Sequence, residues 1–112
     1  MEEKETITQE SNTSYQEFVL KNGEIVNISL SFKRLALLRK LNFELYERFN
    51  KINYGKSEDI LDLVTMIYVA YWCENHKIGK EIYSEDDFIE LVPFDMTEIQ
   101  RVYNSLMRPK KK

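Results

Sequence analysis

Residues Ser57–Asn75, with the sequence SEDILDLVTMIYVAYWCEN, decide the fold of this 112-residue chain. A serine followed by acids is typical of a helix start, because these residues cap backbone N–H groups and complement the helix dipole. From Leu63 to Cys73 only Thr65 is polar, so the predicted helix is apolar on nearly every side. We therefore expect a central helix, part of whose surface is covered by another protein chain. The side chains expected at that interface are Met66, Val69, Trp72 and Cys73.

One basic amphipathic helix is predicted upstream, over residues 31–53. Ser31 is its expected N-cap, and apolar residues recur at helical spacing from Phe32 to Ile52. We expect Gly55 to end this helix in the left-handed conformation that glycine adopts easily.

The N-terminal part of the chain predicts a β-hairpin. The dipeptide Asn22-Gly23 suits a type I′ turn, and alternating apolar residues flank it in Gln16–Leu20 and Glu24–Leu30. Residues 1–14 are acidic and show no hydrophobic periodicity, so we expect a disordered leader there.

Two shorter helices are predicted after the central one. Ser84 and Asp95 are the expected N-caps, Pro93 stops the first of these helices, and Glu98 completes a capping box in the second. The predicted fold is mainly α, with an N-terminal β-hairpin followed by a bundle of about four helices. Its predicted organisation is a leader at 1–14, a single domain at 15–107 and a basic tail at 108–112.

The net charge of −3 hides blocks of opposite sign. Residues 31–56 carry seven basic and two acidic side chains, residues 57–98 carry eleven acidic and two basic ones, and residues 99–112 carry five basic and no acidic ones. This layout favours attraction within or between copies, although ordinary solvated helix faces explain it equally well. In the first basic block we expect Arg34 and Arg39 to contact a protein partner.

The sequence offers little catalytic chemistry. One cysteine and one histidine exclude a disulfide within the chain and a zinc site of Cys and His ligands completed by one chain. No nucleotide-binding, zinc-protease or serine-hydrolase motif is present. No apolar run approaches the ~18 residues of a membrane-spanning helix. We therefore expect no enzymatic activity, no cofactor, no metal and no membrane partner.

Two small clusters have both a chemical and a structural interpretation. Cys73 and His76 are spaced as half of a metal site or a Cys–His pair, but a core thiol beside a helix-end histidine explains them better. The acids Glu85, Asp86, Asp87 and Glu90 suggest paired carboxylates or a cation site. Acids in a first helical turn are what capping predicts, and the glycine of a calcium loop is missing.

From about Phe18 onward the sequence resembles the tail assembly chaperones of long-tailed phages and prophages of Gram-positive bacteria. The resemblance lies in the order and spacing of three segments. They are ISLSFKRLALLRKLNFELYERFNKI (Ile28–Ile52), SEDILDLVTMIYVAYWCEN (Ser57–Asn75) and the acidic YSEDDFIELVPFDMTEIQRVYNSLM (Tyr83–Met107), followed by a Pro-Lys-rich end. The polar leader departs from the family pattern.

The resemblance implies a small, mainly helical, non-enzymatic protein that self-associates. Such proteins bind the helical, aggregation-prone tape measure protein and help tail tube protein subunits assemble around it. They act in the host bacterial cytoplasm and are absent from the finished virion.

Two other functions stay open at the level of sequence. A small phage-encoded DNA-binding regulator would contact phosphates through Arg34, Arg39 and Lys40. Glutamates on the same helix and the acidic middle block argue against a nucleic-acid partner. An enzyme is the third possibility, and it would need a cofactor or metal for which the sequence shows no motif.

Overall fold

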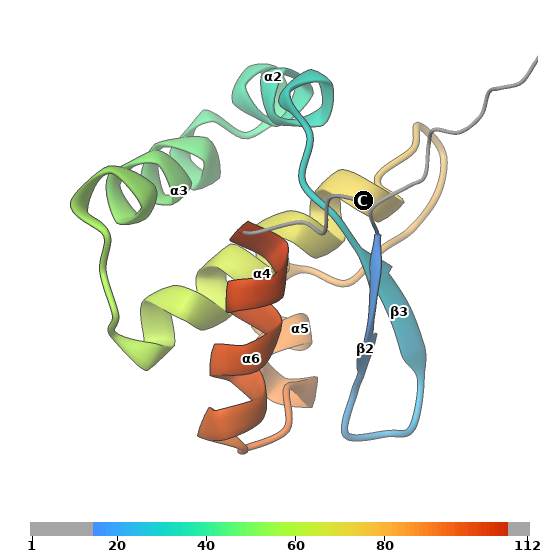
Figure 1. Ribbon diagram of the computed structural model, residues 1–112. Helices are drawn as coiled ribbons and strands as arrows, with labels where there is room; N and C mark the ends of the chain where they lie inside the picture. Colours follow the sequence, from blue (N-terminus) through green and yellow to red (C-terminus); the bar gives the residue numbers. More distant parts are fainter. Residues whose placement is uncertain (1–14, 108–112) are drawn as a thin grey trace, which may run out of the picture.

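The computed structural model describes residues 15–107, which form two strands and five helices around one apolar core (Figure 1). In chain order the elements are β2 (Gln16–Val19), β3 (Ile25–Ile28), α2 (Phe32–Leu41), α3 (Phe43–Gly55), α4 (Ile60–Asn75), α5 (Glu85–Leu91) and α6 (Met96–Met107). The predicted fold class, mainly α with an N-terminal β-hairpin, is confirmed. The predicted leader at 1–14 and tail at 108–112 lie outside the described residues.

Helix α4 lies at the centre of the molecule, as predicted. Every residue from Leu63 to Cys73 is buried. Strand β3 and helix α6 pack along α4, and α2, α3 and α5 cover its other sides (Figure 1). The backbone N–H of Ser29 donates to the carbonyl oxygen of Ala70 at 3.1 Å and fixes the end of the hairpin against α4. No helix in the described part of the chain has the length and apolar character needed to cross a lipid bilayer.

The start of α4 lies later than predicted. Asp59, not Ser57, is the N-cap, because its carboxylate accepts from the backbone N–H of Leu61 at 2.9 Å. The hydroxyl of Ser57 instead donates to Asp62 at 2.7 Å and holds the preceding connection against the first turn.

The predicted helix over residues 31–53 is in fact two helices, α2 and α3, separated by Asn42. The side chain of Asn42 accepts from the backbone N–H of Leu45 at 3.2 Å, while its own backbone N–H donates to the Leu38 carbonyl at 2.7 Å. Asn42 therefore ends one helix and caps the next, because a short amide side chain competes with the helical backbone for hydrogen bonds. The break turns Leu38 and Leu45 into the core and leaves Leu41 exposed.

The end of α3 also differs from the prediction. Gly55 is the last helical residue, and the left-handed position falls on Lys56, with φ of 53° and ψ of 45°. The backbone N–H of Lys56 donates to the Asn53 carbonyl. A residue with a Cβ atom therefore occupies the left-handed position that glycine usually takes at the end of a helix.

The hairpin is confirmed, but its turn is not of type I′. Only Gly23 among the turn residues has a positive φ, of 88°, whereas a type I′ turn needs two such residues. The backbone N–H of Gly23 donates to the Leu20 carbonyl and that of Leu20 donates to Glu24, each at 2.9 Å. This is a three-residue loop with glycine in the left-handed position, further held by the Asn22 side chain, which accepts from the Glu24 N–H at 3.0 Å.

Helices α5 and α6 begin at the predicted caps. The side chain of Ser84 accepts from the backbone N–H of Asp87 at 3.2 Å, and that of Asp95 accepts from the N–H of Glu98 at 3.1 Å. The predicted capping box does not form, because the Glu98 carboxylate pairs with Arg101 at 2.6 Å and the backbone N–H of Asp95 donates to the Pro93 carbonyl at 2.9 Å.

Candidate protein-interaction site

The predicted interface on α4 is not exposed on the folded chain. Met66 and Val69 are 0% exposed, Cys73 is 1% exposed and Trp72 is 7% exposed. The expectation that these side chains face a partner overlooked the surface that the hairpin and α6 supply. Because both elements pack directly on α4, the chain itself covers the apolar stretch Leu63–Cys73 of its central helix.

Arg34, predicted to contact a partner, is engaged inside the chain. Its Nε donates to the backbone oxygen of Cys73 at 2.7 Å, and its Nη2 donates to the backbone oxygen of His76. These carbonyls belong to the last turn of α4, where helical oxygens lack partners and the helix dipole is negative. The guanidinium therefore ties α2 to the end of α4.

Arg39 has a different position from Arg34, because it lies on the exposed side of α2. Its guanidinium carbon lies 5.8 Å from the centre of the Tyr46 ring of α3. The cation and the aromatic face stabilise each other there, and the contact holds the cationic group at the edge of a groove.

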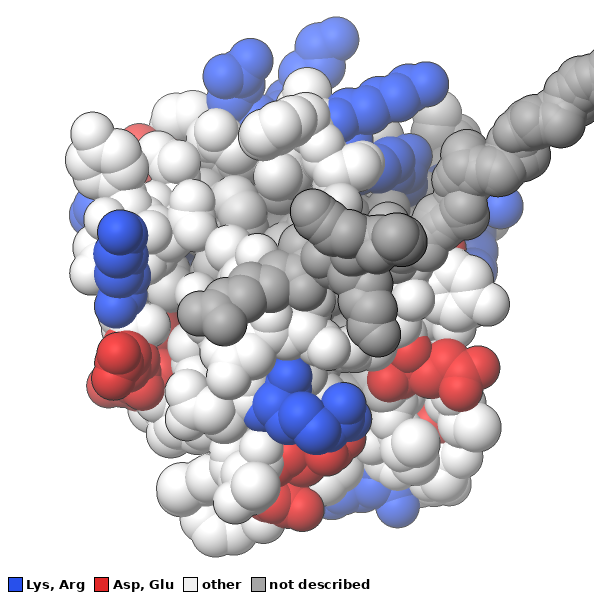
Figure 2. All heavy atoms as spheres, viewed as in Figure 1, with Lys and Arg blue, Asp and Glu red and all other residues white. Residues whose placement is uncertain are grey.

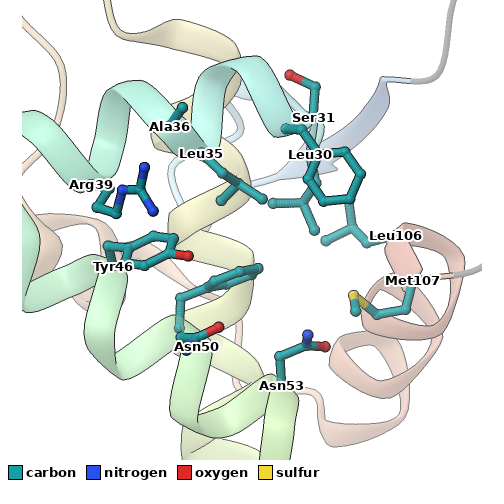
Figure 3. Close-up of a pocket in the computed structure, with 12 residues that line it drawn as sticks. Leu30, Ser31, Leu35, Ala36, Arg39, Tyr46, Asn50, Asn53, Leu106 and Met107 are labelled. Carbon is teal, nitrogen blue, oxygen red and sulfur yellow. The ribbon is translucent and has the colours of Figure 1, made fainter.

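An apolar groove of about 600 Å³ lies between α2, α3 and the C-terminal end of α6 (Figure 3). Leu30 and Leu35 point into it from the α2 side, while Leu106 and Met107 approach it from α6. The other lining residues are Ser31, Phe32, Ala36, Arg39, Tyr46, Phe49, Asn50 and Asn53. This groove is the candidate site for an interaction with another polypeptide.

Phe32 is the most exposed aromatic side chain in the lining of this groove. It is 91% exposed, although aromatic residues of small domains are usually at least half buried. Exposed aromatic area beside a groove is typical of protein-interaction sites. The sequence placed Phe32 on the apolar side of its helix, but the break at Asn42 leaves this first turn outside the core.

Over residues 15–107, the basic charge beside the groove lies on its α2 side. Helix α2 carries four basic residues and no acidic one, whereas α3 carries two of each sign. Figure 2 shows Lys and Arg side chains gathered over α2, beside a largely uncharged surface between α2 and α6. In the described part of the chain, the basic residues of α2 are therefore the ones that would attract an acidic partner to the groove.

The Cys73–His76 pair has the structural role that the sequence favoured. Burial raises the pKa of the Cys73 thiol to about 12, so the reactive thiolate is not available near neutral pH. The His76 ring stacks on Trp72, with ring centres 4.3 Å apart and planes 9° apart. Among the described residues, no group of three or more potential ligand side chains is placed to hold a metal ion.

The acidic cluster at the start of α5 places Glu85, Asp86 and Asp87 in the first turn of that helix. Glu85 accepts from Arg48 of α3 at 2.5 Å and 3.0 Å, which joins a basic and an acidic segment of the chain. The backbone N–H of Asp87 is capped by Ser84. These contacts match the capping interpretation of the acids.

Comparisons of the chain with models of protein families, with curated proteins and with solved structures give no match.

Proposed function

We propose that this protein is a tail assembly chaperone of a long-tailed phage or prophage, and that it binds the tape measure protein while the tail is assembled. The observation that carries the proposal is the apolar groove between α2, α3 and α6. Grooves of this kind accept the apolar face of an amphipathic helix. The order of the sequence segments, which resembles that family, supports the same function.

The proposal includes several features of the family. The protein acts without enzymatic activity in the host cytoplasm, self-associates, cooperates with the tail tube protein and is absent from the finished virion. Since Leu63–Cys73 of α4 are buried within the chain, self-association has to use surface outside that stretch.

Co-expression with the tape measure protein of the same phage or prophage tests this function. We expect the tape measure protein to stay soluble and to elute with the chain in size-exclusion chromatography, whereas the tape measure protein alone aggregates. A tape measure protein that remains equally insoluble with and without the chain would contradict the proposal. Sedimentation at micromolar concentration tests self-association in the same preparation.

A DNA-binding regulator is the second candidate, and the uniformly basic helix α2 favours it. Arg34 contributes little to it, because the guanidinium already donates to α4. Duplex DNA binding that weakens steeply with salt, and that is lost when Lys33, Arg39 and Lys40 are neutralised, would establish this alternative. Affinity unchanged by those substitutions would exclude it.

A further inference from the structure

We infer that the groove binds one amphipathic α-helix of a partner polypeptide, and that this helix turns an acidic edge toward α2. The inference deepens the proposed function and rests on it, because it takes a client polypeptide as the occupant. Three observations carry it. The groove is lined by apolar side chains, basic residues of α2 lie beside it, and the apolar faces of α5 and α6 are buried in the chain's own core.

The floor of the groove presents apolar side chains from three separate segments. They include Leu35 of α2, Phe49 of α3, and Leu106 and Met107 of α6. Phe32 stands at the rim and is almost fully exposed. A partner helix is about 10 Å wide, and it would present side chains at i, i+3, i+4 and i+7 to such a floor.

The basic rim follows from the positions along α2. At ~100° per residue, the groove-lining residues Phe32, Ala36 and Arg39 occupy one stripe, and Lys33 and Lys40 lie on the adjoining stripe. Both lysines are exposed. Arg39 therefore lies on the groove-lining stripe of α2, and Lys33 and Lys40 lie beside that stripe.

Among the residues that the structure describes, the α3 and α6 sides of the groove are lined by no charged side chain. Helix α3 contributes Tyr46, Phe49, Asn50 and Asn53, all of them uncharged. The α6 wall consists of Leu106 and Met107. A bound helix therefore gains from acidic residues on the side facing α2, and from uncharged polar residues on the side facing α3.

The helices of a second copy are poor occupants of this groove. The acidic helix α5 would suit the charge, but its seven residues bury Phe88 in the chain's own core. Helix α6 likewise buries Ile99 and Val102. Because these apolar faces are already covered, neither helix of a second copy offers the groove both an apolar stripe and an acidic edge.

Binding of synthetic helical peptides to the full chain tests the inference directly. The probe is a peptide of about 18 residues, or five helical turns, with leucines spaced by three and four, glutamates along one flank and glutamines elsewhere. A matched peptide carries lysines in place of the glutamates. We expect the glutamate peptide to bind about tenfold more tightly than the lysine peptide at low salt, and this difference to shrink as salt is added.

Substitutions with matched controls locate the site. Phe32→Ala should weaken binding of the glutamate peptide about fivefold or more, whereas Phe94→Ala, at a residue 87% exposed beyond the other end of α6, should not. Arg39→Glu together with Lys40→Glu should weaken binding about tenfold. Lys51→Glu is the charge control, since Lys51 is exposed on α3 and lines a separate hollow beside Ser57 and Asp62.

Several results would overturn the inference. One is equal affinity for both peptides, and another is affinity unchanged by Phe32→Ala and by the double charge substitution. Dimers lost on Phe32→Ala would assign the groove to a second copy, and peptide binding only after removal of residues 1–14 would assign it to the chain's own leader.

A tape measure complex that survives the groove substitutions would overturn this inference and leave the proposed function intact. No complex with the unsubstituted chain would overturn the proposed function itself.

Discussion

Arg34 joins two helices whose contacting residues are about forty positions apart in the sequence. Its side chain is half-buried, and both of its acceptors are backbone oxygens near the end of α4. A charged donor is well suited to this place because the last carbonyls of a helix have no partners within the helix. The sequence indicated a basic side chain here but could not indicate that its partner is the chain itself.

Replacing Arg34 should therefore destabilise the fold. Arg34→Ala removes two charge-assisted hydrogen bonds and leaves the α4 carbonyls unpaired, so we expect the free energy of unfolding to fall by about 2 kcal/mol. Urea unfolding followed by circular dichroism measures the loss, and Arg34→Lys should recover part of it. Lys33→Ala, at the neighbouring exposed position, is the control and should change stability by less than about 0.5 kcal/mol. Equal effects of the two alanine substitutions would show that the Arg34 contacts do not stabilise the fold.

Cys73 links burial to the pH dependence of stability. Burial raises the pKa of its thiol from about 9 to about 12 in the folded chain. The unfolded chain, whose thiol pKa is lower, releases this proton at lower pH, so the folded state holds more protons above pH 9. The stability that comes from burying the neutral thiol is therefore fully present below pH 9 and is lost as the pH rises toward 12.

We expect the free energy of unfolding to decrease above pH 9, with a slope that approaches about 1.4 kcal/mol per pH unit from this single group. Burial also raises the pKa of Tyr68 to about 12, which steepens the decline above pH 10. Urea titrations at half-unit steps from pH 7 to 10.5 measure this slope. Cys73→Ala should flatten it between pH 9 and 10, and an unchanged slope in that variant would rule out the thiol as the cause.

At the scale of single elements, two neighbouring residues at the end of α3, Gly55 and Lys56, each adopt the backbone conformation that suits the other. Gly55 is helical, where glycine is unfavourable, and Lys56 is left-handed, where a Cβ atom is unfavourable. A Cβ atom at Gly55 would meet nothing within 4 Å. The helix end therefore tolerates exchange of the two residue types.

Gly55→Ala and Lys56→Gly should each stabilise the protein, by about 0.5–1 kcal/mol. Gly23→Ala and Gly79→Ala are the controls, since these glycines have φ of 88° and 84° and should lose stability on substitution. Thermal unfolding of the four variants separates the cases. Destabilisation by Gly55→Ala would show that Gly55 is not helical in solution.

The elements that the sequence predicted well are those with local causes. The caps at Ser31, Ser84 and Asp95 depend on one side chain and the next turn, so the pattern alone located them. The sequence did not predict the break at Asn42, because asparagine ends one helix and caps the next only where tertiary packing stabilises both of the resulting helices. Here Leu38 of α2 and Leu45 of α3 pack into one core, which stabilises both helices.

The candidate site was harder to predict than the fold, because the groove combines distant parts of the sequence. Leu30 and Leu106 line the same space although 76 positions separate them in the chain. The apolar run in α4 suggested an interface, but the inward side chains of the hairpin, which include Phe18 and Ile28, complete the core instead. Of the predicted contact residues, Arg39 alone lies in the groove.

At the scale of the whole molecule, Phe88 connects three parts of the core. It is 0% exposed, and its ring centre lies 6.2 Å from that of Phe18 on the hairpin. The same ring lies 5.3 Å from Tyr68 and 4.7 Å from Tyr71, both on α4. A short helix thus contributes the aromatic ring that joins the hairpin to the central helix.

We expect Phe88→Ala to cost about 3–5 kcal/mol, because it leaves a cavity where the hairpin, α4 and α5 meet. A loss of this size is a large share of the ~5–15 kcal/mol that typically stabilises a domain, so unfolding should shift for every element together. Phe94→Ala is the matched control, since Phe94 is 87% exposed and should change stability by less than about 0.5 kcal/mol.

Amide hydrogen exchange read at Phe18 in β2, at Val69 in α4 and at Val102 in α6 distinguishes local from global loss. Equal loss of protection at the three sites is expected because one core contains all of them. Loss confined to the hairpin, with α4 and α6 still protected, would show that β2 and β3 unfold independently of the helical core.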